Sequence, residues 1–103
     1  MIVIAKLQAQ AGKEQELEDV LAHTVAPAQS DPGNIVYALH RVVDSTGKFV
    51  LIEGWETQAD YDAHMATEHT ADLVAALGDL LAEAPDIEKC ELHELGDAQK
   101  RHV

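Results

Sequence analysis

The sequence predicts an α+β fold of the ferredoxin-like type, in which helices pack on one face of an antiparallel sheet. The first observation is the order of the expected elements: strand, helix, strand, strand, helix, strand. The second is length, because a chain of 103 residues forms one hydrophobic core. The third is composition, since 47% hydrophobic and 25% charged residues are typical of a globular protein. We therefore expect one domain over residues 1–95 and a short tail over 96–103.

The beginning of the chain predicts a strand followed by an amphipathic helix. Residues 1–9 (MIVIAKLQA) are rich in β-branched side chains, which favours a short strand that ends before Gly12. After it, acidic residues precede a helical repeat, and Pro27 closes the repeat. Acidic residues favour the start of a helix and proline favours its end, so a helix is expected over 13–26. Its inward stripe consists of Leu17, Val20, Leu21 and Thr24.

The middle of the chain predicts a β-hairpin. The segment SDPGN, residues 30–34, has the composition of a turn. Two apolar runs follow, over 35–43 and 48–55, and DSTG joins them. Such a pairing of runs around a short polar segment that contains glycine is typical of a hairpin.

The last third predicts an interrupted helix and a final strand. Thr57, with Asp60 three positions later, resembles a capping box in which Asp replaces the usual Glu. We expect the helix that starts there to break within 66–69. It then resumes on a stripe of leucines and ends at the APD segment, before a final strand over 87–95. The stripe consists of Leu73, Leu77, Leu80 and Leu81.

Both faces of this sheet are predicted to be apolar. In the first strand, Ile2 and Ile4 lie on one side, and Val3 and Ala5 lie on the other. A sheet with one wet face would instead alternate apolar and polar residues. Because a monomer rarely exposes an apolar patch of more than a few hundred Å², we expect a homodimer packed sheet to sheet.

The charge of the chain argues against two kinds of partner. Nineteen acidic and seven basic residues give a formal charge of −12, which repels phosphate backbones and anionic lipid headgroups. Neither a nucleic acid nor a membrane is therefore expected as a partner. Cys90 is the only cysteine, so no intrachain disulfide forms. A cytoplasmic location is expected by default, because MIVIAKLQ lacks the pattern of a secretory signal.

Two segments carry a resemblance to a known family. FVLIEGWETQADYDAHMATEHT, residues 49–70, resembles the signature of the antibiotic biosynthesis monooxygenase family, in which E-x-W ends a strand and a His follows nine positions after the Trp; Glu53, Trp55 and His64 fill these positions. DPGNIVYALHR, residues 31–41, is similar to the family's E-P-G-x-x-x-Y-x-L-x-R, with Asp31 in place of Glu. The resemblance implies a dimeric α+β barrel like that of the small quinol monooxygenases.

The resemblance also implies an activity. It suggests an oxygenase that acts on a quinol, an anthrone or a similar electron-rich aromatic, with dioxygen as co-substrate and without flavin, haem or metal. The sequence departs from the patterns of two branches of the family. The haem-degrading branch carries an Asn on its first strand, and MIVIAKLQA has none. Some polyketide-tailoring members carry an Asn four residues before the Trp, where this chain has Leu51.

Oxygenation without a cofactor requires a base and a dry pocket, because the substrate must become an electron-rich anion before it can pass an electron to triplet dioxygen. His64 is the candidate base, since imidazole titrates near neutral pH, and Asp60 one turn earlier is the candidate to hold its ring. Trp55 offers a flat wall and one N–H donor for an oxyanion. The candidate substrate-binding residues are Tyr37, Leu51, Tyr61 and Arg41.

Each of these residues also has a structural interpretation. Trp55 could be a core or interface anchor, and His64 could be bonded to Asp60 or to a backbone carbonyl. Glu53 is expected to be the structural partner of a buried polar group, with Arg41 across the hairpin as one possibility. The hairpin register decides whether these two share a face.

A metal site is not expected from the spacing. His64 and His69 are five positions apart, which places them about 140° apart around a continuous helix, so they should not converge. Two alternative functions remain open. One is an isomerase of a small phosphorylated or carbonyl compound, which would need cationic groups near its pocket. The other is a non-catalytic dimer that binds a hydrophobic metabolite.

Overall fold

The computed structural model describes residues 1–101, so His102 and Val103 of the expected tail lie outside the described residues. The elements follow one another in the order strand, helix, strand, strand, two helices, strand, and a short 3-10 helix lies in the tail. Their bounds are β1 Ile2–Gln8, α1 Glu14–Gln29, β2 Asn34–Arg41, β3 Lys48–Trp55, α2 Gln58–Met65, α3 Glu68–Leu77, β4 Asp86–Cys90 and the 3-10 helix Ala98–Lys100.

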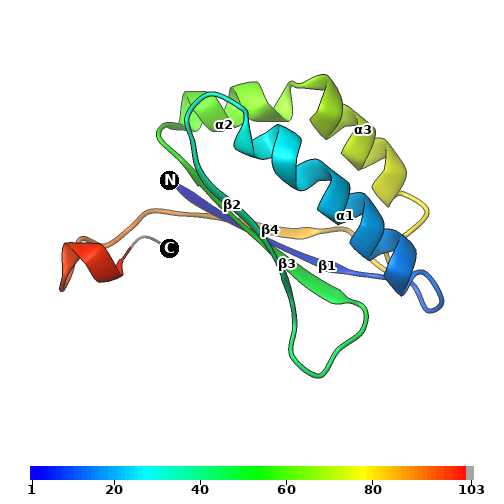
Figure 1. Cartoon of the computed structure of the whole chain (residues 1–103). Helices are drawn as coiled ribbons and strands as arrows, with labels where there is room; N and C mark the ends of the chain where they lie inside the picture. The colour runs from blue at the N-terminus through cyan, green and yellow to red at the C-terminus, as the bar shows by residue number, and fades with distance from the viewer. Residues whose placement is uncertain (102–103) are drawn as a thin grey trace.

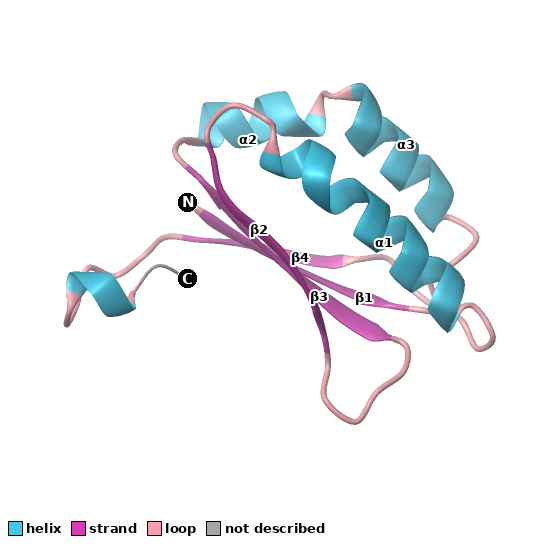
Figure 2. Cartoon of the chain, in the orientation of Figure 1, coloured by secondary structure: helices cyan, strands magenta, loops and turns pink. Residues whose placement is uncertain are grey.

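One antiparallel sheet and one layer of helices make up the fold over residues 1–101. The strands lie in the order β2-β3-β1-β4, and α1, α2 and α3 all cover the same face of the sheet (Figures 1 and 2). The predicted ferredoxin-like α+β class is therefore confirmed. The strand β1, first in the sequence, lies inside the sheet between β3 and β4.

The strand register determines which side chains face the helices. Ala5 lies opposite Leu51 and Leu7 lies opposite Phe49, and cross-strand partners point to the same face. These side chains are buried, and so are Leu17 and Leu21 of α1. The main core therefore lies between the helix layer and the β1–β3 pair.

Several predicted boundaries were wrong by a few residues, each for a physical reason. Pro27 lies inside α1 rather than after it, because the last turn continues through a bond from Ser30 N–H to the Ala26 carbonyl. The final strand ends at Cys90 rather than at residue 95, because Cys90 already pairs with Ile2, the first residue of β1. Leu80 and Leu81 follow α3 instead of extending it, since the helix ends at Leu77, before Gly78. The first hairpin strand likewise ends at residue 41 instead of 43.

The predicted helix start and helix break are both confirmed. The Thr57 hydroxyl accepts the Asp60 N–H as the N-cap of α2. After Ala66, Thr67 caps α3 in the same way by accepting the Thr70 N–H, and its own hydroxyl donates to the His64 carbonyl. The chain therefore changes direction between His64 and His69.

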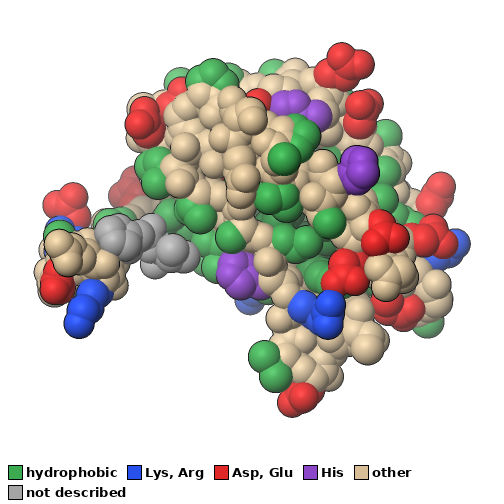
Figure 3. Space-filling model, in the orientation of Figure 1, with side chains coloured by type: hydrophobic (Ala, Val, Ile, Leu, Met, Phe, Trp, Pro, Cys, Tyr) green, Lys and Arg blue, Asp and Glu red, His purple; other side chains and the backbone are tan. Residues whose placement is uncertain are grey.

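The face of the sheet opposite the helices carries apolar side chains that are half-buried in the single chain. We call it the open face; its apolar members are Ile2, Ile4, Val36, Ala38, Val50 and Ile52. Elsewhere, acidic side chains are spread over the visible surface and basic ones are few (Figure 3). Among residues 1–101, no helix combines the length and the apolar character needed to cross a bilayer.

Candidate functional site

An aromatic cluster surrounds His64 where the end of β3 meets α2. Trp55 ends β3 and is fully buried, and its ring centre lies 4.6 Å from that of His64. The rings of Tyr37 and Tyr61 lie 5.9 Å and 6.3 Å from the same imidazole. His64 is only 5% exposed, so these rings hold it in a largely dry environment.

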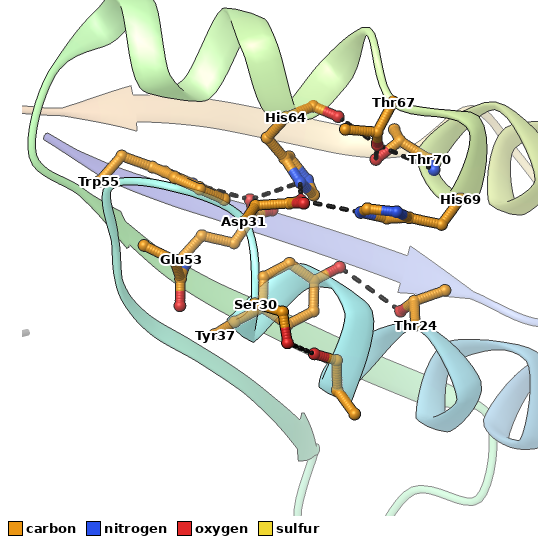
Figure 4. Close-up of polar contacts among 12 residues, drawn as sticks. Thr24, Ser30, Asp31, Tyr37, Glu53, Trp55, His64, Thr67, His69 and Thr70 are labelled. Carbon is orange, nitrogen blue, oxygen red and sulfur yellow. Dashed lines mark hydrogen bonds and ion pairs between the residues drawn. The ribbon is translucent and has the colours of Figure 1, made fainter.

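Asp31 joins His64 to His69. Its Oδ2 atom lies 2.7 Å from His64 Nδ1 and 2.8 Å from His69 Nε2, and Figure 4 shows the carboxylate between the two rings. Asp31 comes from the turn after α1, and the histidines come from α2 and α3. The break at residues 66–67 allows both rings to reach one oxygen. The expectation that His64 and His69 do not converge was therefore wrong, because it assumed one continuous helix.

A second carboxylate lies on the other side of His64. Glu53 is buried and accepts the Trp55 indole N–H at 3.1 Å. Its Oε1 atom is 3.8 Å from His64 Nε2. Glu53 is thus the partner of a buried polar group, as predicted. The indole N–H is not free for an oxyanion, which corrects that expected use of Trp55.

The two carboxyl groups have opposite electrostatic environments. Burial raises the pKa of Asp31, but the hydrogen bonds from His64 and His69 lower it more, and the resulting pKa lies below the ordinary value. Burial raises the pKa of Glu53, and the bond from Trp55 and the charge of His64 offset only part of this. Asp31 therefore holds its negative charge, whereas Glu53 holds its proton more tightly.

A small cavity of about 90 Å³ lies between the sheet and the helices. Three of the predicted substrate-binding residues, Tyr37, Leu51 and Tyr61, line it together with His64 and Glu53. Most of the other lining side chains are aliphatic. Burial raises the pKa of Tyr37 to about 12, so its phenol stays neutral and can donate a hydrogen bond.

Two predicted site residues lie elsewhere. Asp60 does not hold His64, because its carboxylate accepts the Thr57 hydroxyl at 2.8 Å and Asp31 takes the place beside the ring. Arg41 is an exposed residue that forms an ion pair with Glu18 at 2.7 Å. In the hairpin register Glu53 lies opposite Tyr37, four residues before Arg41, so Arg41 neither pairs with Glu53 nor lines the cavity.

Trp55 also lies outside the cavity wall. It packs against the imidazole of His64 and is not among the residues that line the cavity. The expectation that Trp55 forms a flat wall of the pocket is therefore wrong for this cavity, whose aromatic lining residues besides His64 are Tyr37 and Tyr61. Trp55 contacts two of the lining residues, since its ring lies beside that of His64 and its indole N–H donates to Glu53.

Asp31 and His69 were missed as site residues. Asp31 was noted only as the residue that replaces a Glu in a family pattern, and it reaches His64 across 33 positions of the chain. His69 was set aside on helical spacing. A usable signal was present, since Thr67 caps a new helix between the two histidines.

Comparisons with known proteins agree with this architecture. Residues 1–76 match the family model described as antibiotic biosynthesis monooxygenase. The chain is 24% identical over 94 residues to uncharacterized protein sll1783 of Synechocystis sp., a match that covers 91% of this chain and 64% of that protein. The chain thus spans less than two thirds of that relative's length.

Solved structures show the same fold. PA3566 from Pseudomonas aeruginosa is 30% identical, with a TM-score of 0.80 over 84% of this chain and 87% of that one. Rv0793 from Mycobacterium tuberculosis is 24% identical, with a TM-score of 0.84 over 92% of this chain and 97% of that one. Because the family model matches well over half of the sequence, the chain belongs to the antibiotic biosynthesis monooxygenase family.

Proposed function

We propose that this protein is a cofactor-independent monooxygenase that oxidises a small quinol, anthrone or similar electron-rich aromatic with dioxygen. The observation that carries the proposal is the Asp31–His64 pair at the wall of an apolar cavity. A buried carboxylate that orients an imidazole is a recurrent way to build a general base. The family to which the chain belongs supports the class of reaction.

His64 acts as the base through Nε2. Asp31 stays ionised and can only accept hydrogen bonds, so Nδ1 of His64 carries the ring proton at 2.7 Å from it. Nε2 then has a free lone pair for a substrate hydroxyl proton. Asp31 stabilises the imidazolium that results, because a negative charge at hydrogen-bond distance favours the protonated ring.

The remaining steps follow from the chemistry of the anion. The substrate anion passes one electron to dioxygen, and the two radicals combine to form a carbon–oxygen bond. The oxygen–oxygen bond then breaks, so one oxygen atom stays on the ring. The other leaves as water with the two hydrogens that the substrate loses. Tyr37, which keeps its phenolic proton, and Tyr61 shape a site from which water is excluded.

The size of the cavity limits the substrate. A cavity of about 150 Å³ holds benzene in a well-studied case, whereas this one measures about 90 Å³. A ring substrate must therefore displace part of the lining. Met65 is 42% exposed and Val74 is 58% exposed, and both line the cavity. Since methionine adapts its shape readily, we place the entrance beside Met65.

We further propose a homodimer formed through the open face. Proteins of this fold are commonly dimeric, and a second copy would bury the six apolar side chains that the single chain leaves partly exposed. The lone cysteine, Cys90, is free. This is compatible with the reducing conditions of the cytoplasm, which we take as the location.

The two alternatives have less support. An isomerase of a phosphorylated compound needs cations, but among the described residues no Lys or Arg lines the cavity. The nearby Lys89 places its Nζ atom over the Tyr61 ring, 5.1 Å from the ring centre. A purely binding dimer would be favoured by a His64 turned away from the cavity, whereas His64 lines it.

The test is oxygen uptake by metal-stripped protein with a panel of hydroquinones and anthrones. We expect uptake that saturates with one of these substrates and falls at least 100-fold in His64→Ala. His93→Ala is the matched control, since His93 is exposed and lies outside the cavity lining. Uptake at the buffer rate with every substrate, or equal uptake in His64→Ala, would overturn the proposal.

A further inference from the structure

The cluster formed by Asp31, His64 and His69 has the composition and geometry of a metal-ligand set. Its three candidate ligand atoms, one carboxylate oxygen and two ring nitrogens, lie within 4.8 Å of one another. They come from three separate segments that the fold brings together. We propose that these residues bind one divalent transition-metal cation, with Zn²⁺ as its probe. This inference does not rest on the proposed oxygenation, although it shares His64 with it.

The distances fit such an ion after a small adjustment. Zinc lies about 2.0–2.2 Å from nitrogen and carboxylate ligands, so two ligands of a tetrahedral ion are about 3.3 Å apart. In this cluster Asp31 Oδ2 is 2.7 Å from one ring nitrogen and 2.8 Å from the other. Replacing the two bridging protons by an ion requires these separations to widen by roughly half an ångström. The two ring nitrogens lie within 4.8 Å of each other and must come to a similar separation of about 3.3 Å, so the Asp31 and His69 side chains have to rotate when the ion binds.

The surroundings of the ligands also suit a cation. A histidine that binds metal usually donates its other ring N–H to a carboxylate, a backbone carbonyl or water, and His64 Nε2 lies 3.8 Å from the carboxyl oxygen Oε1 of Glu53. The Trp55 N–H fixes that carboxylate. Three protein ligands leave one coordination position for water or a small molecule.

A route for the ion leads from solvent to His69. This side chain is 31% exposed and lines a groove of about 490 Å³ between α1 and α3. Asp19 and Asp72 also line this groove. Together with the net charge of −12, they favour the approach of a cation.

The donor set indicates the class of metal. Two imidazoles and one carboxylate suit borderline ions such as Zn²⁺, Co²⁺, Ni²⁺ and Fe²⁺, whereas Mg²⁺ and Ca²⁺ prefer oxygen ligands alone. Magnesium and calcium at equal concentration should therefore not compete with zinc.

Metal binding and base chemistry exclude each other at His64. A cation on Nδ1 takes the place of the ring proton that Asp31 accepts, and the remaining proton of a neutral imidazole then lies on Nε2. Nε2 no longer has a free lone pair for a substrate proton. The metal-loaded protein should therefore lose any oxygenase activity that the metal-free protein has.

The experiment is calorimetric titration of metal-stripped protein with ZnCl₂, together with the visible absorption spectrum after addition of CoCl₂. We expect one Zn²⁺ to bind per chain. The Co²⁺-loaded protein should show the strong visible absorption that is typical of four- or five-coordinate cobalt. In His69→Gln, whose amide can still donate to Asp31, affinity should fall at least tenfold. His23→Ala, in the same groove but outside the cluster, should bind like the parent. Melting temperatures without metal check that each variant folds.

Two results would overturn the inference. One is the absence of saturable Zn²⁺ binding in the parent protein, which would mean that the three residues form a hydrogen-bonded cluster and no metal site. The other is equal affinity in the parent and His69→Gln, which would place the ion elsewhere. Oxygen uptake by metal-free His69→Gln is measured separately. Absence of metal binding therefore does not contradict the oxygenase proposal. Absence of oxygenase activity likewise does not affect the interpretation of the metal titration.

Discussion

The substitution Asp31→Asn removes the carboxylate that accepts from two histidine rings at 2.7 and 2.8 Å. An amide oxygen in place of Oδ2 has two lone pairs and can still accept both N–H groups, but it carries no negative charge, so neither bond is charge-assisted any longer. Two charge-assisted hydrogen bonds, each worth roughly 1.5–3 kcal/mol, become neutral ones worth about 1 kcal/mol each. We therefore expect the free energy of unfolding to fall by roughly 1–4 kcal/mol, a large share of the 5–15 kcal/mol typical of a domain.

Urea unfolding at pH 7 in the presence of EDTA measures this loss, since the chelator prevents a bound ion from adding to the stability of the parent protein. Asp44→Asn is the matched control. Asp44 is exposed and has a positive φ of 63°, which Asn tolerates well, so its effect should stay within about 0.5 kcal/mol. A loss below about 1 kcal/mol in Asp31→Asn would refute the bridging role of Asp31.

Two further predictions concern the cavity and the open face. Burial raises the pKa of Tyr37 to about 12 against about 10 in an unfolded chain. The folded state therefore holds this proton when the unfolded state has lost it, and stability should fall by up to about 3 kcal/mol as the pH rises from about 10 to 12. Tyr37→Phe should remove that part of the alkaline loss in denaturation curves, and an unchanged pH profile would contradict the assignment of this loss to the Tyr37 phenol. On the open face, Ile52→Asp should convert the expected dimer to a monomer in light scattering, while Val43→Asp, at the exposed hairpin, should leave it intact. A monomeric parent protein would contradict the dimer.

Local features were predicted well because their causes are local. The cap at Thr57 depends on a side chain three positions away, and the element order depends on short apolar patterns. The predicted final strand is too long because the end of this strand depends on where its partner β1 begins. That information lies near the other end of the chain.

The candidate site was predicted only in part for the same reason. The family pattern identified His64 and Glu53, and the cavity brings them together with Tyr37, Leu51 and Tyr61. The acid that holds His64 was assigned to Asp60, its neighbour in the helix, but the turn before β2 places Asp31 there instead.

The contact between Asp31 and His69 spans 38 positions. It also depends on a helix break whose direction the sequence does not specify. Contacts of this kind follow from packing, and residue spacing alone does not predict them.

The most direct measurement of the central claim is the fate of labelled dioxygen. Metal-stripped protein is incubated under ¹⁸O₂ with the substrate of the panel that gives the fastest oxygen uptake, and the mass of the product is measured by mass spectrometry. We predict a product that carries one ¹⁸O atom, with labelled water as the other product, and no such product from His64→Ala beyond the rate in buffer. An unlabelled product, or equal labelling with the parent protein and His64→Ala, would contradict oxygenation at the Asp31–His64 pair.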